Sequence, residues 1–159
     1  MAAQLDYGFS TPKGVAGGKV DLAYDEVVTR QVEDADGVVK FGMAVAIGTS
    51  AGATIKKPVE GTTAAQIEGV LLHAANTEQD TNGKVVIKKG TSQGVMRKGH
   101  VWGRIASDAT PTYGSVAYVV VSGDDAGTFT EKSEGTVDIG AKFGAHADTD
   151  NGIAVIELN

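Results

Sequence analysis

The chain has 159 residues, no cysteine, 22 glycines and a formal net charge of −6, which suits one domain that needs no disulfide framework. Because the acidic chain has no basic stripe to replace counterions on phosphates, we exclude nucleic acid as its main partner. No stretch is long and apolar enough to cross a bilayer or to act as a secretory signal, so we expect no membrane partner and synthesis in the cytoplasm.

The chain begins with a segment that differs from the rest. Residues 1–19 show no sustained hydrophobic period and become rich in glycine, whereas β-type runs start at Val20. We therefore divide the chain into a flexible N-terminal arm, residues 1–19, and a single all-β domain, residues 20–159. Tyr7 and Phe9 lie within three residues of each other, which favours an arm that becomes ordered against a neighbour over a fully solvated tail.

Short β-type runs follow one another along the domain, separated by turns rich in Gly, Asn, Asp or Pro. No long amphipathic helix interrupts them. This pattern predicts an all-β sandwich or barrel. The expected strands are 27–32, 38–47, 54–58, 67–74, 84–87, 94–105, 115–121, 128–130, 136–143 and 153–158, with one helical turn at 62–66.

The stretch from Val85 to Val121 is the expected centre of the fold, because it holds three of these runs. In the middle run we expect simple alternation, with the odd-numbered residues 95–105 on one face and the even-numbered residues 96–104 on the other. Trp102, the only tryptophan, is predicted to pack in or near the core. Residues 116–121 are almost continuously apolar and predict a strand covered on both faces.

Three patterns raise the question of catalysis or metal binding. Residues 48–52 match Gly-x-Ser-x-Gly, but a short β run follows instead of the helix that a nucleophile elbow needs, so we interpret Ser50 as part of a hairpin loop. The acidic turns 34–37 and 148–152 lack the remaining ligands of a calcium loop. The three histidines are too scattered to predict a zinc site, and we expect them to face water. We predict neither a metal nor a cofactor, and no enzyme activity.

The order of several sequence blocks is more informative, and it resembles the structural cement, or head decoration, proteins of tailed bacteriophages. The resemblance extends from about Val20 to Asn159. Its most specific parts are Phe-Gly-Met-Ala-Val-Ala-Ile-Gly-Thr at 41–49, Val-Met-Arg-Lys-Gly-His-Val-Trp-Gly at 95–103 and Asn-Gly-Ile-Ala-Val-Ile-Glu-Leu-Asn at 151–159.

The resemblance implies a compact β-tulip, sandwich-like or barrel-like body with an extended N-terminal arm. It further implies a non-enzymatic protein of the virion that is assembled in the host cytoplasm, binds the outside of the phage head and cements neighbouring subunits of the major capsid protein. Homotrimers are expected, and dimers less often. Within the arm, Tyr7, Phe9 and Val15 are our predicted contacts with the capsid or with a neighbouring copy.

Two other functions stay open at this point. A receptor- or carbohydrate-binding β domain of a phage fibre or cell-surface protein would need an exposed aromatic platform, for which the chain offers one tryptophan, four tyrosines and four phenylalanines. An esterase-like enzyme would act through Ser50, and unchanged hydrolysis in a Ser50→Ala comparison would exclude it.

Overall fold

The computed structural model describes residues 14–75 and 78–159, and it confirms the predicted all-β fold. Its one helical element is a single 3-10 turn in the predicted place, η1 (Ala64–Gln66). The strands of the described residues are β1 (Glu26–Val32), β2 (Ala44–Ile47), β3 (Thr54–Lys56), β4 (Ile67–Leu71), β5 (Ser92–Arg104), β6 (Val116–Val120), β7 (Phe129–Thr130), β8 (Thr136–Asp148) and β9 (Ile153–Leu158).

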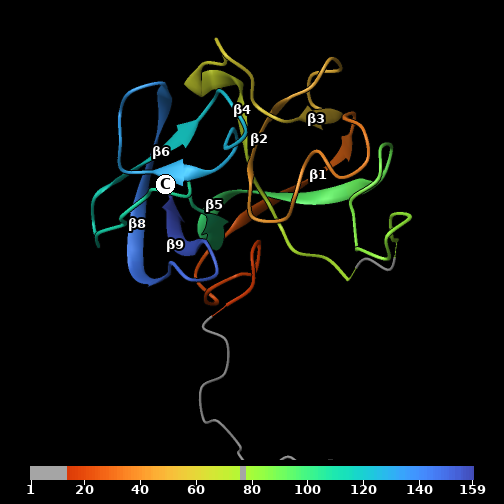
Figure 1. Ribbon diagram of the computed structural model, residues 1–159. Helices are drawn as coiled ribbons and strands as arrows, with labels where there is room; N and C mark the ends of the chain where they lie inside the picture. The colour runs from red at the N-terminus through yellow and green to blue at the C-terminus, as the bar shows by residue number, and fades with distance from the viewer. Residues whose placement is uncertain (1–13, 76–77) are drawn as a thin grey trace, which may run out of the picture.

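Five of the strands close into a small barrel. Their order is β1-β3-β2-β4-β5, and β5 pairs back onto β1 (Figure 1). The β1–β3 pair is parallel, and the other pairs of the ring are antiparallel. Small aliphatic side chains form one buried cluster among these strands and the loops beside them, which suits the narrow interior of a barrel. The cluster comprises Val32, Val39, Val45, Ile55, Leu71, Ile87 and Val95.

A second sheet continues from the barrel in the order β5-β9-β8-β6-β7. A larger apolar cluster joins the two parts, because it includes Ala44, Val70 and Met96 of barrel strands together with residues of the second sheet. Phe129 and Phe143 are its largest buried side chains, at 0% and 1% exposure. Burying a phenylalanine contributes roughly 1.5–3 kcal/mol, so this cluster carries much of the stability.

Strand β5 belongs to both parts and is the centre of the fold. Its residues 92–98 pair with barrel strands, and its residues 99–104 pair with β9. The predicted simple alternation along it is wrong, because Met96 and Val101 lie in the same apolar cluster although they differ in parity. Gly99 lies between them with φ of 120°, a conformation that breaks the two-residue period of an extended strand.

Two other expected strands differ from the structure. The run 38–47 becomes a strand only from Ala44, because Gly42 adopts φ of 80° and its N–H donates to the Leu71 carbonyl at 2.8 Å. Residues 84–87 form no strand and make only an isolated bridge at Val85. They pack instead as a loop, in which the Ile87 carbonyl accepts a hydrogen bond from the Gly37 N–H at 2.9 Å.

The structure also differs from the prediction that residues 116–121 form a strand covered on both faces. Ala117 and Val119 are fully buried, but the alternate residues of the strand are only half-buried, so coverage of both faces is incomplete. Continuous hydrophobicity in this strand therefore overstates its burial.

Across residues 14–75 and 78–159, the structure contains no helix with the length and hydrophobicity needed to span a membrane.

Residues 14–20 lie against the free edge of the second half of β5. The Gly17 N–H donates to the Trp102 carbonyl at 2.7 Å, and the Trp102 N–H donates to the Gly18 carbonyl at 2.9 Å. Trp102 is 5% exposed and packs with Ala16 and Val20, which confirms its predicted place in the core. This segment pairs an edge that would otherwise present open backbone groups to solvent.

Candidate interaction surfaces

The predicted contact residues fall on both sides of the boundary of the described structure. Tyr7 and Phe9 lie outside the described residues. Val15 is 52% exposed, in the turn that Gly18 closes by donating its N–H to the Val15 carbonyl at 2.8 Å. Its side chain is therefore presented to solvent from a segment that is hydrogen-bonded to β5, in a position where a neighbouring protein can reach it.

Residues 21–26, which comprise the loop before β1 and the first residue of that strand, form a segment that we call the acidic knob. Leu22 is fully exposed and Tyr24 is 82% exposed, the largest exposed fractions among the large apolar side chains of the described residues. Asp21, Asp25 and Glu26 surround these two residues with negative charge. Large apolar side chains that stand together on a surface mark an interaction site, so the knob is a candidate contact.

The knob is held in place by its acidic residues. Asp21 accepts the Ala23 N–H at 3.0 Å and lies 2.6 Å from Nδ1 of His100, while Asp25 pairs with Lys19. The hydrogen bond with His100 lowers the pKa of Asp21 below its ordinary value. Because these bonds already hold the loop in one conformation, the loop loses little conformational entropy when a partner covers Leu22 and Tyr24.

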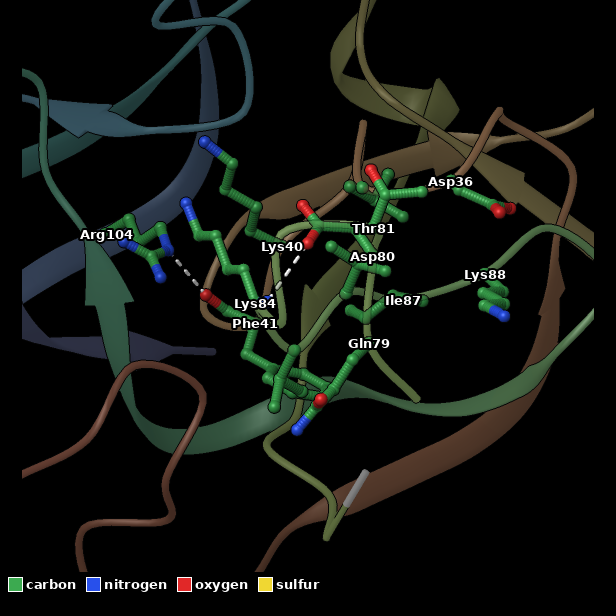
Figure 2. A pocket seen from close by; sticks show the side chains of 14 residues that line it. Asp36, Lys40, Phe41, Gln79, Asp80, Thr81, Lys84, Ile87, Lys88 and Arg104 are labelled. Atoms are coloured by element: carbon green, nitrogen blue, oxygen red, sulfur yellow. Dashed lines mark hydrogen bonds between the residues drawn. The ribbon is translucent and has the colours of Figure 1, made fainter. Parts of the chain in front are cut away.

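A hollow of about 710 Å³ lies between loops 36–41 and 79–88 and the end of β5. We call it the basic hollow. The apolar part of its lining includes the half-buried Phe41 and the exposed Val85, beside Val39 and Ile87, which are almost fully buried. Figure 2 shows Lys40 and Lys84 extending toward the side of the hollow where Arg104 lies. Its lining includes four cationic side chains and two carboxylates, a net of +2 in a chain whose net charge is −6.

The cations and carboxylates of the basic hollow differ in how they are bonded. Asp80 accepts the backbone N–H of Asn82 and Lys84, at 2.8 and 3.0 Å, so its charge is used within its own loop. Arg104 donates Nε to the Phe41 carbonyl at 2.8 Å, and its partial burial lowers its pKa below the ordinary value. Among the described residues no carboxylate forms a salt bridge with the cations Lys40, Lys84 or Arg104.

The Gly-x-Ser-x-Gly pattern lies in a hairpin loop between β2 and β3, as predicted. The Gly48 N–H donates to the Thr54 carbonyl at 2.8 Å and closes the loop. Glu33 accepts hydrogen bonds from the Thr49 N–H at 2.7 Å and from the Thr54 hydroxyl at 2.8 Å. The Thr49 bond lowers the pKa of Glu33, so the charge in this loop serves its closure and no base is aligned on Ser50 within the described residues.

The two acidic turns use their carboxylates to bond the chain itself. Asp34 accepts the Lys57 N–H at 2.5 Å, Asp36 accepts the Lys89 N–H at 2.9 Å, and Asp148 accepts the Asn151 side-chain amide at 2.8 Å. No three His, Asp or Glu side chains within 14–75 and 78–159 come together in a way that could hold a metal ion.

The predicted exposure of the histidines holds for two of them. His73 and His146 are exposed, and the His73 ring lies 5.0 Å from that of Phe41. His100 is half-buried and contacts Asp21 at the base of the knob, so for this residue the predicted exposure is only partly right. An alternating β pattern could not reveal this contact, because Asp21 is 79 residues away along the chain.

A buried ion cluster connects three strands of the barrel. Glu68 of β4 is 4% exposed, and its Oε1 accepts hydrogen bonds from Arg30 of β1 at 2.8 Å and from Arg97 of β5 at 2.6 Å. Hydrogen bonding to Glu68 raises the pKa of Arg97. Because a buried carboxylate without such partners is costly, the cluster fixes how β1, β4 and β5 come together.

Sequence reasoning missed both candidate surfaces. The knob residues lead into the first strand and were grouped with the β domain, although a Leu and a Tyr among three acidic residues are a weak signal of an exposed contact. The basic hollow had no signal in the sequence at all. Lys40, Lys84 and Arg104 are distant along the chain and meet only because loop 79–88 folds beside loop 36–41.

The structure defines a small all-β domain with two candidate interaction surfaces among its described residues. The chain belongs to the family described as structural cement protein (E217 gp24/Pam3 gp6), whose profile matches residues 3–159. The family resemblance stated from the sequence is thereby confirmed.

The fold is also found in a solved structure. A chain from "The capsid of Myoviridae Phage XM1" superimposes with a TM-score of 0.75 and 17% sequence identity, over 100% of this chain and 98% of that one. At this identity the likeness concerns the fold alone. A comparison with curated proteins gave no match.

Proposed function

We propose that this protein is a structural component of a phage virion that binds the outside of the head, cements neighbouring subunits of the major capsid protein and so stabilises the capsid. The observation that carries the proposal is membership of the structural cement family over residues 3–159. In this role the protein acts by contact, without catalysis or a cofactor, and it assembles onto heads in the host cytoplasm.

The structure supports such a role through the rigidity of its body. A closed barrel and a second sheet that share β5 give a scaffold whose loops are held by backbone and carboxylate hydrogen bonds. A cement protein repeated over a lattice can use many modest contacts, because each further contact on the same surface adds avidity. We propose Val15, with Tyr7 and Phe9 of the arm, as contacts with the capsid or a neighbouring copy, and a homotrimer as the binding unit.

Co-sedimentation of the purified full-length chain with expanded heads of its source phage tests the proposal. We expect saturable binding at a fixed ratio to the major capsid protein, and greater resistance of decorated heads to heat. Absence of binding to intact heads at low and moderate salt would contradict the proposal and favour the alternative of a receptor- or carbohydrate-binding domain.

The contribution of the arm is tested by two truncations. Removal of residues 1–13 leaves the Gly17 and Gly18 bonds to Trp102, whereas removal of residues 1–18 also takes them away. We expect the shorter truncation to keep the fold and lose head affinity, and the longer one to raise the exposure of Trp102 as well. Unchanged head binding after removal of residues 1–13 would take Tyr7 and Phe9 out of the contact.

A further inference from the structure

We propose that the acidic knob of one copy docks into the basic hollow of a second copy, in a head-to-tail contact that repeats around a closed ring. The proposal deepens the proposed function, because it names the two surfaces through which the cementing unit holds together. Its test uses the free protein without heads, so its failure and the failure of head binding are separate results.

The charges of the two surfaces are complementary. The knob carries three carboxylates, on Asp21, Asp25 and Glu26, and the hollow carries a net of +2. Each knob carboxylate contacts one side chain of its own copy (Lys19, His100 or Arg97), but the three acidic side chains remain between 27% and 45% exposed. The cations of the hollow have no carboxylate partner among the described residues. An incoming acidic segment supplies the counter-charge that the hollow lacks.

The apolar parts also match. Leu22 and Tyr24 project from the knob into solvent, and the lining of the hollow includes the apolar side chains of Phe41 and Val85 beside its charged groups. Val85, which lines the same hollow, is 46% exposed and becomes covered when the hollow is filled. An anchor of large apolar residues in a pocket, surrounded by polar groups, is the arrangement in which a few residues carry most of the binding energy.

The two surfaces lie on different elements, which sets the symmetry of the contact. The knob ends at the first residue of β1 and lies beside the second half of β5, whereas the hollow lies between two loops and the end of β5. Each copy therefore offers one knob and one hollow, and the contact is heterologous. Such a contact forms a ring when its rotation closes, in agreement with the homotrimer proposed above.

The first test compares self-association of variants by light scattering and sedimentation velocity. Leu22→Ser/Tyr24→Ser should weaken association by about 30-fold or more, because it removes the anchor. Lys84→Glu should weaken it by about tenfold, since it places like charge against the knob. Matched controls are Val59→Ser, an exposed apolar residue elsewhere, and Lys142→Glu, an exposed cation of β8. Both controls should associate like the original chain.

The second test mixes two variants that are each defective. Leu22→Ser/Tyr24→Ser retains its hollow, and Lys40→Glu/Lys84→Glu retains its knob. An equimolar mixture should form a dimer of one copy of each, which native mass spectrometry identifies by mass, because one intact knob then meets one intact hollow. Circular dichroism confirms that each variant is folded before mixing.

Three results would overturn the proposal. The original chain could be monomeric at the highest soluble concentration, the mixture could give no mixed dimer, or the knob and hollow variants could associate as the controls do. If Lys84→Glu associates normally but no longer binds heads, the hollow is a capsid contact and the second-copy assignment is wrong.

Discussion

The barrel and the second sheet share β5, yet different interactions hold them together. The barrel combines small aliphatic side chains with a buried ion cluster on Glu68 and a hairpin fastened by Glu33. The second sheet relies on a larger apolar cluster with two buried phenylalanines. Apolar packing depends on the volume of buried side chains, whereas the ion cluster depends on paired charges, so the two parts should respond differently to core truncation and to removal of a buried charge.

The largest effect is expected from a core truncation in the second sheet. Phe143→Ala removes a side chain that is 1% exposed and should lower the free energy of unfolding by about 3–5 kcal/mol. Urea denaturation followed by the fluorescence of Trp102 and by circular dichroism measures this change. Phe41→Ala, at a half-buried site beside the barrel core, serves as the control with a smaller loss. A loss below that of Phe41→Ala would contradict the comparison.

The ion cluster gives the next largest effect, in the barrel. Glu68→Gln leaves Arg30 and Arg97 without their shared carboxylate and should cost about 2 kcal/mol. Glu26→Gln is the matched control, because Glu26 contacts Arg97 at 3.5 Å from an exposed position, and it should cost below about 0.5 kcal/mol. Equal unfolding free energies for the two variants would show that burial adds nothing to this cluster.

A glycine substitution tests the point where the two parts meet. Gly99→Ala puts a side chain at φ of 120° and brings its Cβ to 2.9 Å from Asp25 Cβ, so it should cost about 1–2 kcal/mol. Gly94→Ala in the same strand meets no atom closer than 3.6 Å and should be within about 0.5 kcal/mol of the original chain. Thermal unfolding of both variants measures the difference in stability. Equal stability of the two variants would show that the conformation of Gly99 is not required at the junction.

Acid should give the smallest effect, and in the barrel it should act through Glu33. The folded-state pKa of Glu33 lies below its ordinary value of 4.5, mainly because of the Thr49 N–H. The resulting stabilisation is therefore present above pH 4.5 and is lost as pH falls through the folded-state pKa. Glu33→Gln should be less stable than the original chain at pH 7, by below about 1 kcal/mol, and equally stable at strongly acidic pH. A difference that persists in acid would assign the loss to packing.

Local sequence patterns predicted the fold class because most strands carry their own signals. The runs that became β1, β4 and β9 combine β-branched residues with flanking turns, and Trp102 was placed in the core for its size. Two of the failures, in the run 38–47 and in β5, share one cause. Gly42 and Gly99 change direction because of segments far away in sequence, and a single sequence cannot show which segments those are.

The interaction surfaces were less predictable than the fold for a related reason. Exposure of Leu22 and Tyr24 depends on what fails to pack against them, and the charge of the hollow depends on two loops and a strand end that meet in space. Val15 was predicted as a contact because it stands in the glycine-rich arm, and the structure shows its side chain to be 52% exposed. Its exposure follows from the bonds of that segment to Trp102, which no local pattern encodes.

The shared strand β5 has a mechanical consequence. A load that pulls the second sheet away from the barrel is carried by the covalent backbone of β5, through Gly99, as well as by the apolar cluster that joins the two parts. Its hydrogen bonds to β1 and β4 at one end and to β9 at the other are perpendicular to this direction, so they are loaded together and not one after another. Strand β5 therefore transmits force between the two parts of the domain.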